Sequence, residues 1–72
     1  MGTELRHLMA SAVEAARLHA GVSFIELSAQ TGIEPAALAD LLEERADFTM
    51  EDVAGIAAVL GVPVTRLLPC AP

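Results

Sequence analysis

Apolar residues recur at the spacing of an α-helix along most of this 72-residue chain. Ala and Leu, which both favour helices strongly, dominate the composition. No stretch of alternating β-branched or aromatic residues is long enough to predict a strand. An apolar fraction of 54% at this regular spacing also argues against an intrinsically disordered chain. We therefore predict an all-α fold with one small core, organised as a single domain over residues 1–72.

Gly and Pro divide the chain into five segments, each with its own helix signals. Capping residues, a Pro at a first helical position and glycines just past helix ends set the bounds of the segments. The predicted helices cover about 4–19, 24–31, 35–45, 50–60 and 64–68. A compact five-helix bundle follows from this pattern.

The apolar stripe of each helix predicts which residues face the core. In the first, third and fourth helices these are Leu5, Leu8, Met9, Ala12, Val13, Ala16, Leu38, Leu41, Leu42, Met50, Val53, Ile56, Ala57 and Leu60. Leu5, Leu8 and Met9 precede the region that the other helices are expected to cover. These three side chains either fold back onto the fourth or fifth helix or form a two-fold contact in a homodimer.

The second and third segments together have the pattern of a helix-turn-helix over about 23–45. A small residue is needed where the two helices cross, and Ser28 occupies that place. Gly32, four residues later, allows the tight turn. The apolar residues that lock the two helices together are Leu27, Ile33, Leu38 and Leu41. The complete spacing is more specific than a lone glycine turn would be.

From about Val13 to Leu68 the chain resembles the Cro/repressor-type (XRE-like) helix-turn-helix proteins. Gly21-Val22-Ser23 resembles the family's Gly-Leu-Ser entry to the second helix, Leu27-Ser28 its Leu-Ala, and Gly32-Ile33 its Gly-Val turn. The resemblance implies a five-helix repressor-like domain that regulates transcription by binding DNA, of the kind that phages and prophages carry. Arg17 stands where the family often has an arginine that contacts phosphate.

The positions that would read DNA differ from the family pattern. Phe24 stands where the family usually has Gln, and the start of the third helix lacks the family's polar and basic residues. The residues predicted to face DNA or a partner are Phe24, Glu34, Pro35, Ala36, Ala37, Ala39, Asp40 and Arg45. Phe24 serves either as a partner-binding anchor or as a cover for the core. Arg17 contacts phosphate or forms a structural ion pair, for which Glu43 is the expected partner.

The charge distribution favours a second hypothesis. The formal net charge of the chain is −6, and residues 22–47 hold six carboxylates against one arginine, a net −5. Phosphate binding depends largely on Lys and Arg, so these carboxylates oppose contact with a duplex. The alternative is therefore a helix-turn-helix used as an acidic adaptor or inhibitor that binds a basic protein partner and no DNA.

Other functional classes have little support in the sequence. Neither a Ser-His-Asp nor a Cys-His arrangement appears, so we expect no enzyme. His7 and His19 lie far apart and Cys70 is the single Cys, so we expect no metal, cofactor or intrachain disulfide. Neither a signal-peptide core nor an apolar run long enough to span a bilayer is present, which predicts a cytoplasmic protein without membrane contact.

Overall fold

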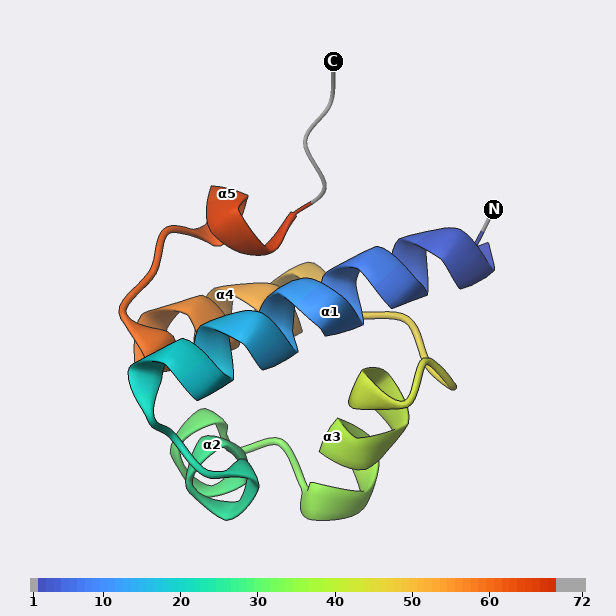
Figure 1. Ribbon diagram of the computed structural model, residues 1–72. Coiled ribbons are helices and arrows are strands. Elements are labelled where there is room, and N and C mark those ends of the chain that lie inside the picture. The colour runs from blue at the N-terminus through green and yellow to red at the C-terminus, as the bar shows by residue number, and fades with distance from the viewer. Residues whose placement is uncertain (1, 69–72) are drawn as a thin grey trace.

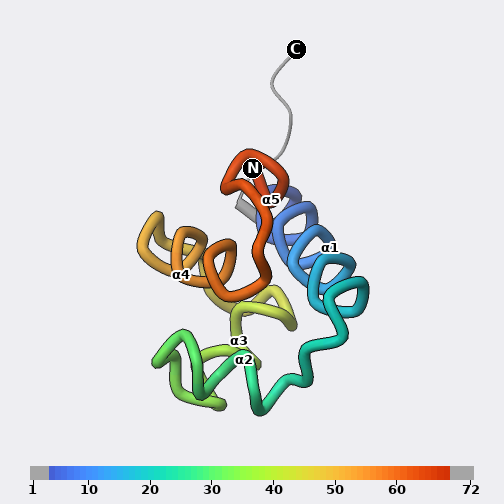
Figure 2. The backbone as a smooth tube through the Cα atoms, turned by 90° about the vertical axis from the view of Figure 1, so that its left-hand side faces the viewer, coloured from blue at the N-terminus to red at the C-terminus, as the bar shows by residue number. Residues whose placement is uncertain are grey.

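The structure is a computed structural model that describes residues 2–68, so Cys70 lies outside the described residues. It contains the helices α1 (Gly2–Ala20), α2 (Phe24–Thr31), α3 (Pro35–Leu42), α4 (Met50–Leu60) and α5 (Val64–Leu67). Helices α1 and α4 lie side by side in the middle of the domain, with α5 on one side of them and α2 and α3 on the other (Figures 1 and 2). The predicted all-α, five-helix fold is confirmed.

The predicted caps of α2 and α4 are present. Ser23 Oγ accepts a hydrogen bond from the Glu26 backbone N–H, and the Glu26 carboxylate accepts one from the Ser23 N–H, each at 3.0 Å. Thr49 and Asp52 form the same reciprocal pair at the start of α4, at 3.1 Å. Such capping boxes satisfy backbone donors that have no partner within the helix. They fix where α2 and α4 begin.

The predicted end of α3 is wrong. The helix ends at Leu42 and does not reach Arg45. Glu44 adopts the left-handed conformation with φ 68°, its N–H donates to the Leu41 carbonyl oxygen at 3.2 Å, and the Arg45 N–H donates to the Asp40 carbonyl oxygen at 2.8 Å. This is the Schellman pattern that usually contains glycine. Because a glutamate takes the glycine position, the sequence carried no signal for this helix end.

All five helices contribute to one core. Its fully or nearly buried apolar side chains are Met9, Val13, Leu27, Leu38, Leu41, Val53, Ile56, Ala57, Leu60 and Leu67. Ala12, Ala16 and Leu42 are partly buried and pack against this cluster. The predicted core therefore includes most of the observed one, and Leu67 of α5 completes it.

One predicted core residue is wrongly placed, and Leu5 and Leu8 do not meet the first of their two predicted alternatives. They remain 47% and 46% exposed, so they do not fold back onto α4 or α5, and the two-fold contact stays a prediction. Met50 is 66% exposed, since it lies in the first turn of α4, one turn before Val53, the first buried residue of that helix. No helix within residues 2–68 is long and apolar enough to cross a membrane.

Candidate nucleic-acid interface

The turn between α2 and α3 is held by side-chain hydrogen bonds as well as by packing. The buried Ser28 donates from Oγ to the Ile33 carbonyl oxygen at 2.6 Å. Gly32 is left-handed with φ 79°, and its N–H donates to the Ser28 carbonyl oxygen at 3.0 Å. Thr31 Oγ1 donates to the Leu27 carbonyl oxygen at 2.7 Å and accepts from the Ile33 N–H at 3.2 Å. This network sets the position of α3 relative to α2.

The spacing of the motif did not predict a role for the Thr31 hydroxyl. Its hydroxyl joins the last turn of α2 to the first residue after the glycine. The available signal was a Thr directly before the turn glycine, where hydroxyl side chains often bond to nearby backbone groups.

The leading end of α3 faces solvent. Glu34, Pro35, Ala36 and Ala37 are all exposed, and Ala39 is partly buried. Glu34 is the N-cap residue, but its side chain accepts no hydrogen bond from the backbone N–H groups in the first turn of this helix. This surface therefore consists of small apolar side chains, one carboxylate and the uncapped N-terminus of a helix.

Phe24 begins α2 and is partly buried, packed against the core cluster. Its side chain therefore covers part of the core and is also partly exposed to solvent. The structure thus brings Phe24 against the core, while the alanines of α3 remain outside it.

Arg45 follows α3 and binds two carboxylates. Its Nε and Nη2 donate to Asp40 Oδ1 at 3.0 and 2.9 Å, and its Nη1 contacts Glu43. Hydrogen bonding to Asp40, and then to Glu43, raises the pKa of the Arg45 guanidinium. Arg45 and Glu43 are largely exposed to water, and the Asp40 side chain is about half exposed. Exposed ion pairs of this kind are worth little and can exchange partners readily.

Arg17 forms a more enclosed ion pair, and its partner differs from the prediction. Its Nε and Nη2 donate to the two carboxylate oxygens of Glu14, each at 2.9 Å, and its Nη1 donates to the Val22 carbonyl oxygen at 3.0 Å. Glu43, the expected partner, contacts Arg45 instead. The hydrogen bond from Arg17 lowers the pKa of Glu14. Arg17 therefore ties the body of α1 to the segment that leads into α2.

The segment after α3 is paired with the first turns of α1. Arg6 Nε lies 2.5 Å from Asp47 Oδ1, and its hydrogen bond lowers the pKa of the Asp47 carboxyl. His7 Nδ1 lies 2.9 Å from Glu44 Oε2. Both contacts bridge residues far apart in sequence, so the N-terminal turns of α1 hold the chain that follows α3.

Most cationic side chains are thus engaged within the chain. Arg6, Arg17 and Arg45 each contact a carboxylate. Within residues 2–68, Arg66 of α5 is the arginine without a salt bridge, and no cluster of three or more His, Cys, Asp or Glu side chains could hold a metal. Few positive charges are left to face phosphate.

The predicted set of dimer contacts needs one correction. Met9 is only 6% exposed and packs in the core of its own chain, so it is not available to a second copy. Leu5 and Leu8 are about half exposed and lie on the surface of α1.

The fold closely matches crystal structures of the clp gene regulator ClgR from Corynebacterium glutamicum. The match has a TM-score of 0.82 and 27% sequence identity and covers 88% of this chain. It covers 67% of the ClgR chain in one crystal structure and 82% in another. No protein-family model matches the sequence, and the comparison with curated proteins also found no match. The match to a gene regulator confirms the resemblance predicted from the helix-turn-helix motif.

Proposed function

Because this chain has the Cro/repressor-type helix-turn-helix fold, we propose that it is a small transcription regulator that contacts DNA through α2 and α3. The observation that carries the proposal is the match to a gene regulator over 88% of the chain. The exposed leading end of α3 supports it, since a recognition helix needs its first residues accessible. This role requires no catalytic step and is consistent with the predicted cytoplasmic location.

In this proposal the small residues of α3 approach the base edges in the major groove. The Ala36 and Ala37 methyl groups suit apolar contact with the methyl group of thymine. The Glu34 carboxylate suits a hydrogen bond from the N4 amino group of cytosine. The uncapped backbone N–H groups of the first turn suit a phosphate oxygen. The preference for particular DNA sequences would then come from the shape of the duplex and from these few contacts with base edges.

Arg45 is the side chain best placed to neutralise phosphate. Its bonds to Asp40 and Glu43 are exposed, so a phosphate can replace these carboxylates at small cost. Arg17 is bound to Glu14 and to the Val22 carbonyl oxygen and is only 17% exposed, so we assign it a structural role. Because so few cationic side chains are available, the affinity for DNA would be modest and would depend only weakly on salt concentration.

A second function is favoured by the charge distribution. Residues 22–47 carry a net −5, and the one arginine among them is already bound to two carboxylates. A basic protein could use this charge together with the alanine surface of α3. The domain would then act as an acidic adaptor or inhibitor and would leave DNA unbound.

One substitution separates the two functions. Ala37→Arg adds a cation and bulk at an exposed position of α3, so the fold should be retained. Fluorescence anisotropy with labelled random-sequence duplex DNA, from low to physiological salt, would measure DNA binding. A regulator that docks α3 on DNA should bind at low salt, and A37R should bind more tightly. The adaptor should show no binding to DNA, and A37R should weaken its binding to an arginine-rich peptide.

Arg45→Ala and Arg66→Ala form the matched pair for phosphate contact. Arg66 lies on α5, across the domain from α2 and α3 (Figure 1). Arg45→Ala should weaken DNA binding and reduce the salt slope by about 1, as expected for the loss of one phosphate contact. Arg66→Ala should leave both unchanged. If the unmodified chain does not bind DNA even at low salt, the regulator proposal fails.

A further inference from the structure

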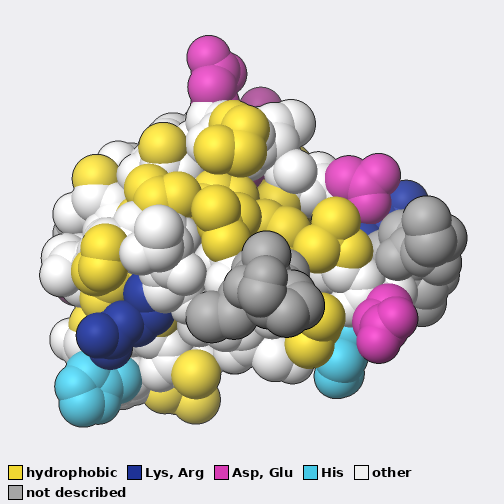
Figure 3. Space-filling model, turned by 90° about the horizontal axis from the view of Figure 1, so that it is seen from above, with side chains coloured by type: hydrophobic (Ala, Val, Ile, Leu, Met, Phe, Trp, Pro, Cys, Tyr) yellow, Lys and Arg dark blue, Asp and Glu magenta, His cyan; other side chains and the backbone are white. Residues whose placement is uncertain are grey.

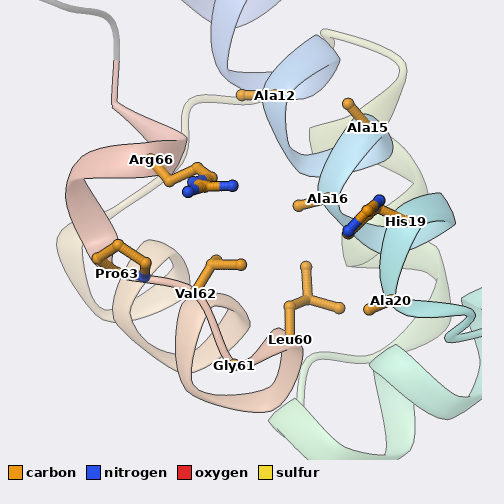
Figure 4. A pocket seen from close by; sticks show the side chains of 10 residues that line it. All are labelled: Ala12, Ala15, Ala16, His19, Ala20, Leu60, Gly61, Val62, Pro63 and Arg66. Carbon is orange, nitrogen blue, oxygen red and sulfur yellow. The ribbon is translucent and has the colours of Figure 1, made fainter.

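A groove of about 630 Å³ separates the C-terminal half of α1 from the connection between α4 and α5. Its α1 wall carries four alanines, and Leu60 and Val62 lie on the opposite wall (Figure 4). These alanines are Ala12, Ala15, Ala16 and Ala20. Pockets that bind small molecules have volumes of about 300–1,000 Å³ and are mostly apolar, with a few polar groups. This groove has the size and the apolar walls of such a pocket.

The groove is long enough to hold an extended apolar chain. Its α1 wall runs from Ala12 to Ala20, a length of about 12 Å at the helical rise of about 1.5 Å per residue. The methyl groups of the alanines are small, so they leave the space between the two walls open. Seen from the α5 side, other apolar side chains gather on the same face of the domain (Figure 3). An apolar tail would therefore contact this groove along its length.

Arg66 places a positive charge in the middle of this apolar groove. Its side chain extends from α5 toward α1 and lies beside Ala12 and Ala16 (Figure 4). The guanidinium has no salt bridge among residues 2–68, whereas the other three arginines each bind a carboxylate. The cation that the described part of the chain does not use is therefore the one that faces an apolar wall.

We propose that the groove binds a small organic acid with one carboxylate and an apolar tail. The Arg66 guanidinium would donate to both carboxylate oxygens, which match its planar set of donors. The tail would lie between the alanines of α1 and Leu60. One guanidinium balances one negative charge, and the formal net charge of −6 opposes the approach of anions with a higher charge. A monocarboxylate therefore fits this groove better than a phosphate ester does.

The ligand site is separate from the proposed DNA contact. The groove lies between α1 and the segment around α5, whereas α2 and α3 lie on the other side of α1 and α4 (Figure 1). The two sites share no residue, so ligand binding can be measured without any nucleic acid. Failure of either proposal would leave the other intact.

Titration of the ¹⁵N-labelled full chain with octanoate at neutral pH, followed by amide NMR spectra, tests the proposal. Octanoate should cause saturable shifts of the amide signals of Ala16, Gly61 and Arg66, which line the groove. Octan-1-ol has the same tail without the charge. It should bind at least about tenfold more weakly, as expected for the loss of hydrogen bonds between two charged groups. Acetate, which has the charge without the tail, should cause no saturable shift.

Arg66→Met tests the role of the charge. Arg66 is exposed, so the variant should keep its helices by circular dichroism. It should bind octanoate at least about tenfold more weakly and bind octan-1-ol as the unmodified chain does. Arg45→Met is the matched control, because it changes the net charge equally and lies outside the groove. It should leave octanoate binding unchanged.

Ala15→Leu tests the position of the tail. Ala15 is exposed and lines the groove, so a leucine there fills the groove without entering the core, and it should weaken the binding of both octanoate and octan-1-ol. Ala54→Leu, at an exposed position of α4 outside the groove, should weaken neither.

Four results would each overturn the proposal. They are the absence of a saturable shift with octanoate, equal affinities for octanoate and octan-1-ol, equal effects of the Arg66 and Arg45 substitutions, and equal effects of the Ala15 and Ala54 substitutions. Shifts of the groove signals when the protein concentration rises without ligand would mean that a second chain fills the groove, and would also overturn it.

Discussion

Ser28 and Ile33 are joined across the turn of the helix-turn-helix by a hydrogen bond of 2.6 Å from the serine hydroxyl to the isoleucine carbonyl oxygen. The serine is only 5% exposed, so if its hydroxyl were removed, little water could reach the Ile33 carbonyl oxygen to replace the hydrogen bond. Ser28→Ala should lower the free energy of unfolding by about 1 kcal/mol. Urea denaturation followed by far-UV circular dichroism measures this, since the chain has neither Trp nor Tyr. Ser11→Ala, on the exposed face of α1, should cause no loss.

Gly32 and Gly55 predict opposite effects of one substitution. A Cβ atom added at either position would meet nothing within 4 Å, so the backbone alone decides the result. Gly32 is left-handed, and Gly32→Ala should destabilise the domain by about 1 kcal/mol. Gly55 lies inside α4, and Gly55→Ala should stabilise it by about 0.5–1 kcal/mol. Thermal unfolding measures the melting temperatures of both variants. If both melting temperatures shifted in the same direction, the left-handed conformation of Gly32 would not be the cause of the effect.

Glu44 is the non-glycine residue with positive φ among residues 2–68. Glu44→Gly removes the steric cost of that conformation and should raise the free energy of unfolding by up to about 1 kcal/mol, less the small contribution of the exposed His7 contact. Glu43, with φ −92°, has no such cost. Glu43→Gly should therefore not raise the free energy of unfolding. Chemical denaturation of the two variants side by side provides the measurement.

The ion pair between Arg17 and Glu14 predicts a pH dependence of stability. Because Arg17 lowers the pKa of Glu14 in the folded state, the pair stabilises the fold above the ordinary glutamate pKa of about 4.3. That contribution should disappear as the pH falls through the lowered pKa. Melting temperatures of the unmodified chain and Arg17→Met should differ at neutral pH, and the difference should become smaller in acid, where the hydrogen bond from Arg17 to the Val22 carbonyl oxygen remains. Arg66→Met is the control, and a difference that persists undiminished in acid would contradict this role of Glu14.

The sequence predicted those parts of the fold that depend on local signals. The capping boxes at Ser23 and Thr49 begin helices where expected, because serine and threonine hydroxyls act on backbone groups two or three residues away. The end of α3 could not be predicted in the same way. A glutamate, Glu44, takes the left-handed position there, and the chain after it is in contact with Arg6 and His7 of α1, which are distant in sequence.

The candidate interface was predicted less completely than the fold. The exposure of Ala36 and Ala37 follows from their place on α3. The partners of Arg17 and Arg45 do not follow from spacing alone, since several carboxylates lie within reach of each in sequence. The groove beside α1 depends on the position of the chain between α4 and α5, which no local pattern reports.

The helix ends also bear on how quickly this chain can fold. Left-handed residues reverse the backbone after α1, α2, α3 and α4, at Gly21, Gly32, Glu44 and Gly61. The reversals at the three glycines are closed by backbone hydrogen bonds within a few residues. Helical proteins dominated by such local contacts fold in microseconds to milliseconds. We expect relaxation in that range after a temperature jump, with the glutamate at the end of α3 as the least favoured of the four reversals.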